Sequence, residues 1–245
     1  MDDVKVPEDA VTLIVAWSRR EEARNLGASW STEDRVWTIP RARLDAVPRD
    51  LLPIRDRPGL APPYIRVNLV PQGSWGRNLR SMMTPEEWRT FKREHVYATT
   101  GSRCLVCGGR GPEWPVEADE VWRFDDATGI QTLAAVVPLC PACHEVRSAG
   151  LATAKGRGEA AARHLAWVER IPVTAARKRI ADALATWERR SRRKWTIDLS
   201  LMERRLGLEM RHDARRTQAA HDALVADARA RRGGRGPHSR GGRRS

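Results

Sequence analysis

Two Cys-x-x-Cys pairs are the residues of this chain whose spacing most directly indicates chemistry. The first pair is Cys104 and Cys107, and the second is Cys140 and Cys143. Each such turn brings two thiolates to one metal ion, and two turns complete a tetrahedron. These are all the cysteines of the chain. We therefore expect a structural Zn²⁺ site at these four residues, with unrelated buried thiols and a redox pair as less favoured alternatives.

His144 follows the second pair directly, at the start of an expected helix. If zinc takes all four thiolates, the imidazole of His144 is free for a second metal ion. Ser148 lies four residues further on, so a helix places it on the same face as His144.

The residues between the two cysteine pairs have the pattern of a β-hairpin. The segment "PVEADEVW" (115–122) is an expected strand that carries Asp119 and Glu120, and a turn and the apolar segment "LAAVVPL" (133–139) follow it. Two strands and a helix, with acidic residues on the first strand and a histidine on the helix, form a ββα-metal arrangement. Carboxylates in such a site favour Mg²⁺ or Mn²⁺ over zinc.

Five segments of the chain resemble the HNH endonuclease family, closest to a bacterial branch of uncharacterised members. The similarity extends over residues 64–201, and the segments are "LVPQGSWGRNLRSMMTPEEW", "CLVCGGRG", "VEADEVW", "LCPACHEV" and "WERRSRRKWTIDLS". The resemblance implies a divalent ion that contacts the scissile phosphate while a general base activates water. Its ligands would be Asp119, His144 and Ser148, and Glu120 takes the position of the base.

The chain departs from that branch at two ligand positions. Positions 119 and 148 are usually His there, and they are Asp119 and Ser148 here. A carboxylate is a good ligand for a hard ion, whereas a neutral hydroxyl is a weak one. The asparagine of the family name is also missing, since Ala135 stands near its position. Two interpretations stay open: an HNH-type endonuclease that hydrolyses phosphodiester bonds in DNA with an eroded active site, and a catalytically inactive zinc-stapled protein that binds nucleic acid or acts as an adaptor.

The charge of the chain indicates an acidic partner. The formal net charge is +13, and Lys and Arg bind nucleic acid by neutralising phosphates, so we expect nucleic acid, DNA first. Asn78 and Arg80 in "GRNLR" match the family pattern and are expected to face phosphate, with hydrogen bonding inside the loop as the alternative. We expect Arg231, Arg232 and Arg235 of the C-terminal tail to add affinity without sequence specificity.

The order of patterns along the chain predicts an α+β protein with several units. Residues 11–40 resemble a small β-α-β module of plasmid primase-like proteins. Tyr64 is expected to begin a strand, Pro85 a helix, and residues 195–201 a further strand. The expected units are a β-α-β module at 1–47, a Pro/Arg-rich linker at 48–63, an HNH-like zinc-containing domain at 64–205, a polar basic helix at 206–230 and a disordered Arg/Gly tail at 231–245.

The expected location of the protein follows from two sequence signals that are not recognisable here. Neither a secretory signal nor an apolar run long enough to span a membrane is recognisable. We therefore expect a cytoplasmic protein with no membrane partner.

Overall fold

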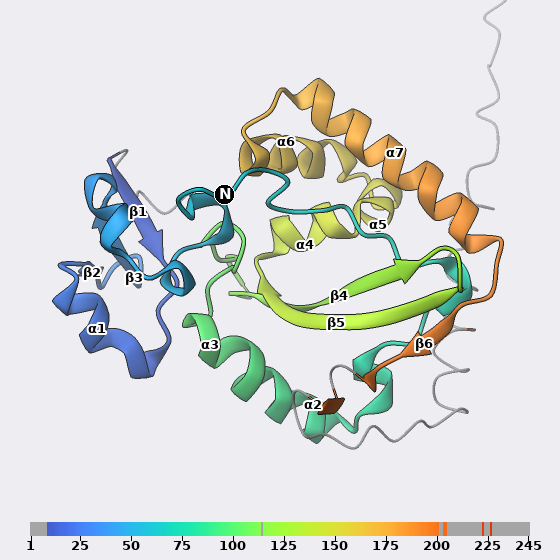
Figure 1. The fold of residues 1–245 in the computed structure, drawn as a ribbon, viewed down its shortest axis with the longest axis horizontal. Coiled ribbons are helices and arrows are strands. Elements are labelled where there is room, and N and C mark those ends of the chain that lie inside the picture. The colour runs from blue at the N-terminus through green and yellow to red at the C-terminus, as the bar shows by residue number, and fades with distance from the viewer. Residues whose placement is uncertain (1–8, 114, 201–202, 205–221, 223–225, 227–245) are drawn as a thin grey trace, which may run out of the picture.

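The structure is a computed structural model that describes residues 9–113, 115–200, 203–204, 222 and 226. Within these residues the chain is mixed α+β, with two three-stranded sheets (Figure 1). Most of the basic helix expected at 206–230, and the whole tail with Arg231, Arg232 and Arg235, lie outside the described residues. None of the helices in the described ranges is long and apolar enough to cross a membrane.

The N-terminal unit has one short helix and an antiparallel sheet. Its elements are β1 (Ala10–Leu13), α1 (Arg20–Asn25), β2 (Ser29–Ser31) and β3 (Val36–Pro40), with β3 in the centre. The β-α-β order expected from the sequence is present in β1, α1 and β3, and the short strand β2 is added before β3. The unit is fastened to the rest of the chain by the buried Arg103, whose Nη2 donates to the backbone oxygens of Asp34 at 3.0 Å and Arg35 at 2.6 Å.

The second sheet contains the predicted hairpin. Strand β4 (Glu117–Asp125) pairs antiparallel with β5 (Ile130–Leu139), and β6 (Thr196–Asp198) adds parallel to β5. The carboxylate of Asp125 closes the turn by accepting a hydrogen bond from the Ala127 backbone N–H at 2.9 Å. Strand, turn and strand therefore occur in the predicted order.

Two helical layers enclose this hairpin (Figure 1). On one side, α2 (Pro85–Phe91) starts with a capping box between Thr84 and Glu87, and a π-helical segment (Lys92–Tyr97) joins it to α3 (Ala98–Thr100). The other layer consists of α4 (Pro141–Arg147), α5 (Ala149–Ala154), α6 (Gly158–Glu169) and α7 (Val173–Ser191). The remaining elements are short 3₁₀ helices at Trp17–Arg19, Arg41–Ala46, Arg49–Leu51, Ile54–Asp56, Gln72–Ser74 and Leu79–Met82.

Separate apolar cores lie on the two sides of the hairpin. Leu139 of β5, Val146 of α4 and Leu165 of α6 are buried together on one side. Trp122 and Leu133 pack with Phe91 on the other side. Burial on both faces fixes the register of the hairpin, because a slip by one residue would exchange the two faces.

The strand expected from Tyr64 does not form. The backbone N–H of Ile65 donates to Glu169 Oε1 at 2.7 Å, and that of Asn68 donates to the backbone oxygen of Arg147 at 3.3 Å. These backbone groups therefore pair with a buried side chain and a helix end instead of a sheet edge, and the alternating sequence reflects packing against α4 and α6.

Candidate metal centre and its neighbouring ionic cluster

The two cysteine pairs meet in one cluster, as predicted. One ligand atom from each of the four cysteines lies within 4.8 Å of all the others. Cys107 Sγ is 3.6 Å from the sulfurs of both Cys140 and Cys143. A tetrahedron with Zn–S bonds of about 2.3 Å has sulfurs about 3.8 Å apart, whereas a disulfide needs about 2.05 Å. The thiols therefore fit a four-coordinate metal ion such as zinc.

Local backbone geometry explains why this sequence folds into a metal-binding turn. Gly108 has a positive φ of 72° and donates its N–H to the Cys104 oxygen at 2.8 Å. A Cβ at Gly108 would lie 2.9 Å from Pro53 and 3.0 Å from Thr12, so a larger residue fits neither the conformation nor the space. On the other side, Cys140 immediately precedes α4, whose first residue is Pro141.

Cationic and aromatic side chains surround the thiols. His164 Nε2 lies 3.1 Å from Cys143 Sγ, and the Arg55 guanidinium stacks on Trp167 at 3.8 Å from the ring centroid. Burial lowers the pKa of Arg55, although the nearby thiolates of Cys107 and Cys143 act in the opposite direction. A zinc ion with four thiolates carries a net charge of about −2, which the Arg55 guanidinium partly offsets.

A second polar cluster lies between β4 and α4. His144 Nδ1 is 2.9 Å from Asp119 Oδ2, and His144 Nε2 is 3.6 Å from Glu117 Oε2. Burial lowers the pKa of His144, but the hydrogen bond and charge of Asp119 outweigh it, so the pKa of the imidazole is raised. The strand and the helix thus bring Asp119 and His144 together.

Arg147 completes this second cluster. Its Nε forms an ion pair with Asp119 Oδ1, and its Nη2 donates to the Glu120 backbone oxygen at 2.9 Å. The side chains of Arg147 and Asp119 are only 10% and 7% exposed, so this is a buried ion pair. Both oxygens of Asp119 are therefore engaged within the protein.

The structure does not bring Glu120 or Ser148 to Asp119 and His144. Consecutive strand residues point to opposite faces, and Glu120 Oε1 accepts the Leu79 backbone N–H at 2.7 Å on the far side of β4. The Ser148 hydroxyl donates to the backbone oxygen of His144 at 2.8 Å. Each polar group thus has a partner away from the Asp119–His144 contact.

The loop residues Asn78 and Arg80 have different roles. Asn78 Oδ1 accepts the Ser81 backbone N–H at 2.9 Å and forms a capping box at the 3₁₀ helix Leu79–Met82. Arg80 is exposed on that helix. The structure therefore gives Asn78 the hydrogen-bonding role that was the alternative in the sequence, while phosphate binding by Arg80 stays a prediction.

Two members of the ionic cluster were missed in the sequence analysis. Glu117 shares a strand face with Asp119 because it lies two residues before it, and Arg147 follows His144 by three residues on a helix. Both spacings were visible in the sequence. A guanidinium among two carboxylates and an imidazole is not typical of a metal-binding site. In addition, Asp119 contacts Nδ1 of His144, whereas Glu117 lies near Nε2 of the same ring. In the part of the chain that the structure describes, the four cysteines are the only group of three or more side chains arranged to hold a metal ion.

The pKa of Glu120 leads to a prediction about stability. Burial raises the pKa of this carboxyl from 4.5 to about 7. The folded state retains the proton of Glu120 to a higher pH than the unfolded state does. The contribution of this carboxyl to stability is therefore fully present below pH 4.5 and is lost as the pH rises through about 7. We expect the free energy of unfolding to fall by up to about 3 kcal/mol over this range. Urea unfolding of wild type and Glu120→Gln at several pH values tests this, since the Gln variant should lack that component. Equal pH profiles would contradict it.

Comparison with protein-family models, with curated proteins and with solved structures gave no match to this chain. The fold class and the cysteine cluster are thus established by the geometry alone.

Proposed function

We propose that this protein is a zinc-stapled ββα protein of the HNH type that binds nucleic acid without cleaving it. The observation that carries this proposal is the buried ion pair between Arg147 and Asp119. A divalent ion at Asp119 would have to displace the Arg147 guanidinium, since both cations would bind the same carboxylate. Arg147 is covalently part of the site, so its effective concentration there far exceeds that of free Mg²⁺.

The order of elements supports the HNH relationship. A Cys-x-x-Cys turn, the β4–β5 hairpin, a second Cys-x-x-Cys turn and α4 follow one another along the chain, and β4 and α4 present Asp119 and His144 to each other at 2.9 Å. Zinc would hold both ends of the hairpin against the start of α4. Bound there, zinc supplies structural cross-linking, because four thiolates leave no open coordination position for water.

Nucleic acid is the partner that best fits the charge of the chain. The formal net charge is +13, and ten Arg against three Asp at 211–245 provide +7 of it. Phosphate neutralisation by such a charge supplies sequence-independent affinity. We place DNA before RNA because of the HNH resemblance.

The second candidate is a metal-dependent DNA endonuclease, and the Asp119–His144 contact favours it. In this function Arg147 would leave Asp119 when substrate binds, and Asp119 and His144 would hold Mg²⁺ or Mn²⁺. Ser148 would have to release the His144 oxygen to become a ligand. Glu120 would need to leave Leu79 and turn to the other face of β4 before acting as a base, so this candidate requires three rearrangements.

A plasmid-nicking assay separates the two candidates. With Mg²⁺ or Mn²⁺, we expect wild type to bind the plasmid in a gel-shift assay and to produce no more nicked circles than buffer alone. Ser148→His and His144→Ala should behave like wild type, because neither removes Arg147 from Asp119. Metal-dependent nicking by wild type that His144→Ala abolishes would establish the endonuclease instead.

A further inference from the structure

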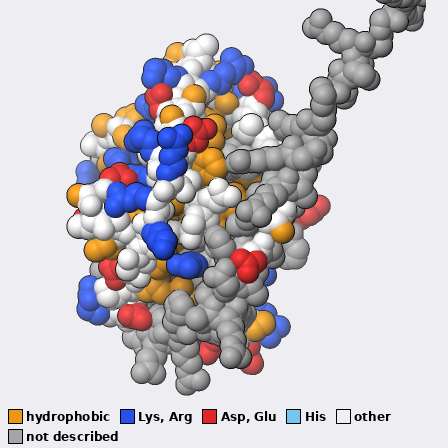
Figure 2. Space-filling model, turned by 90° about the vertical axis from the view of Figure 1, so that its right-hand side faces the viewer, with side chains coloured by type: hydrophobic (Ala, Val, Ile, Leu, Met, Phe, Trp, Pro, Cys, Tyr) orange, Lys and Arg blue, Asp and Glu red, His pale blue; other side chains and the backbone are white. Residues whose placement is uncertain are grey.

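The end of α7 and the β4–β5 turn form a cationic cleft that neither the zinc site nor the ionic cluster uses. Asp126, Arg189, Arg190 and Arg193 line this cleft, whose volume is about 260 Å³. Three guanidinium groups and one carboxylate give it a charge of about +2. Figure 2 views the molecule from this end and shows Lys and Arg side chains gathered in a column on that face.

Two of the arginines are held in place by the fold. Arg190 binds Asp126 with both its Nε, at 2.9 Å, and its Nη2, at 2.6 Å, and its guanidinium lies 4.5 Å from the Phe124 ring centroid. Arg193 donates to the Asp126 backbone oxygen and lies 5.1 Å from the ring of the buried Trp195. These contacts hold the β4–β5 turn against the end of α7 and fix the positions of two of the arginines that line the cleft.

The other cations at this end have no such partner. In the described ranges no carboxylate lies within 4.0 Å of the charged groups of Arg189, Arg192 or Lys194, although the charge of Arg189 acts on Asp126, and all three cations are exposed. Elsewhere on α7 the cations are matched: Arg177 pairs with Glu159 and Lys178 with Asp182. The unmatched charge is therefore confined to the C-terminal end of the helix and the residues that follow it.

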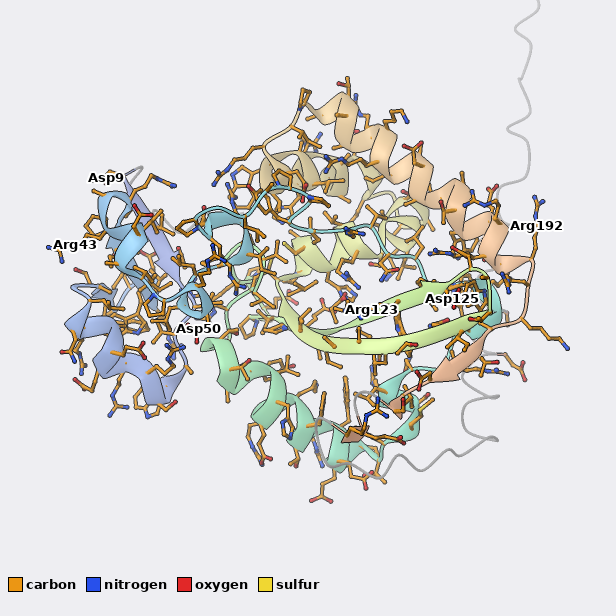
Figure 3. The ribbon with its side chains drawn as sticks, in the orientation of Figure 1. Asp9, Arg43, Asp50, Arg123, Asp125 and Arg192 are labelled. Carbon is orange, nitrogen blue, oxygen red and sulfur yellow. The ribbon has the colours of Figure 1, made fainter. Side chains whose placement is uncertain are left out.

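The end of α7 brings the cations of this surface together beside the cleft. Arg189 lies in the last turn of α7, and Arg192, Arg193 and Lys194 follow directly after the helix ends at Ser191. Figure 3 labels Arg192 at the outer edge of this end, close to the turn that follows Asp125. A lone phosphate would engage only one or two of these groups, whereas a phosphate chain engages several of them.

We propose that this surface, formed by Arg189, Arg192, Arg193 and Lys194 around the cleft, binds successive phosphates of a nucleic-acid backbone. The proposal rests on the proposed function and locates its interface on described residues outside the C-terminal tail. It predicts contacts that position the nucleic acid without reading its sequence, because arginine and lysine reach phosphates here and no base-reading element is required.

The test removes only the cations that have no structural partner. The variant is Arg189→Ala, Arg192→Ala and Lys194→Ala in the full chain, which leaves the Arg190 and Arg193 clamps intact. Binding to a fluorescent 20-base-pair DNA is measured by anisotropy from 0.05 to 0.3 M salt. Each lost phosphate contact reduces the salt slope by about 0.9, so we expect a reduction of about 2 to 3 and roughly tenfold or more weaker binding at 0.15 M salt.

The matched control removes the same charge from the opposite end of the molecule. The control is Arg35→Ala, Arg41→Ala and Arg43→Ala in the N-terminal unit, where the three arginines are exposed. Figure 3 labels Arg43 far from Arg192. This control should keep the wild-type salt slope. Equal losses in both triple variants would overturn the proposal, because they would indicate a general charge effect.

Further outcomes separate this inference from the proposed function. Wild type that fails to bind DNA would refute the proposed function together with the interface. DNA binding by wild type that the cleft variant leaves unchanged would refute the interface alone. If the cleft variant loses binding to vesicles of anionic phospholipid and retains binding to DNA, the surface recognises a membrane and the proposal is wrong.

Discussion

Removal of the metal is expected to unfold the domain that contains the hairpin and α4. The four cysteines come from two turns more than thirty residues apart, and together they connect the segment between α3 and β4 to the end of β5 and the start of α4. Cys104, Cys140 and Cys143 are buried within the same apolar core as Leu139 and Val146. Without the ion, nothing would cross-link the two turns within that core. The apparent binding energy of structural zinc in small domains is about 10–16 kcal/mol, which equals or exceeds a typical stability of about 5–15 kcal/mol.

Elemental analysis and thermal unfolding measure this effect. Native protein should contain one zinc per chain, and a chelator should lower its unfolding temperature to that of Cys107→Ser. The same chelator should leave Cys107→Ser unchanged, which controls for direct effects of the chelator. Native protein without zinc, or a Cys107→Ser variant as stable as wild type, would contradict the assignment.

Local patterns explain why this part of the molecule could be predicted. The Cys-x-x-Cys spacing specifies its own turn, and Gly108 supplies the backbone conformation that the turn requires. The hairpin has a first strand in which apolar and charged residues alternate, an aspartate-containing turn and an apolar second strand. The helix at Pro85 has a capping box with proline at its first position. Each of these signals acts over a few residues, so tertiary contacts did not need to be known.

The candidate site was less predictable, because its contacts depend on which face of a strand each side chain occupies and on residues that are far apart in the sequence. The alternation of strand side chains already separates Glu120 from Asp119, so the expectation of Asp119 as ligand and Glu120 as base in one active site conflicted with a rule that the sequence itself supplies. Ser148 illustrates another competition, since a serine at the end of a helix can satisfy its hydroxyl with the carbonyl four residues earlier. The hydrogen bond between the Ile65 N–H and Glu169 joins residues more than one hundred positions apart, so no local sequence pattern predicts it.

Breaking the buried pair between Arg147 and Asp119 is expected to destabilise the protein strongly. Arg147→Ala would leave a carboxylate that is 7% exposed with only His144 as a partner. Breaking one member of a buried pair typically costs about 3–5 kcal/mol, because the remaining charge stays desolvated. Asp119→Ala should cost a similar amount for the same reason.

A double-mutant cycle measures the coupling between these two side chains. The variant with both Arg147→Ala and Asp119→Ala should be more stable than the sum of the single losses implies, by about 1–3 kcal/mol. The exposed pair Lys178–Asp182, whose side chains are 76% and 63% exposed, is the control. Its cycle should give about 0.5 kcal/mol or less. Additive losses at positions 119 and 147 would show that the two groups do not act as a pair.

The same variants test whether the guanidinium excludes a metal ion. If Arg147 occupies the position that a divalent ion would take, Arg147→Ala should bind Mn²⁺ more tightly than wild type, as measured by electron paramagnetic resonance of the free ion. The gain should disappear in Arg147→Ala with His144→Ala, because the imidazole would be one of the ligands. Tight Mn²⁺ binding by wild type that His144→Ala abolishes would show that Arg147 yields to metal, and would favour the endonuclease over the binding protein.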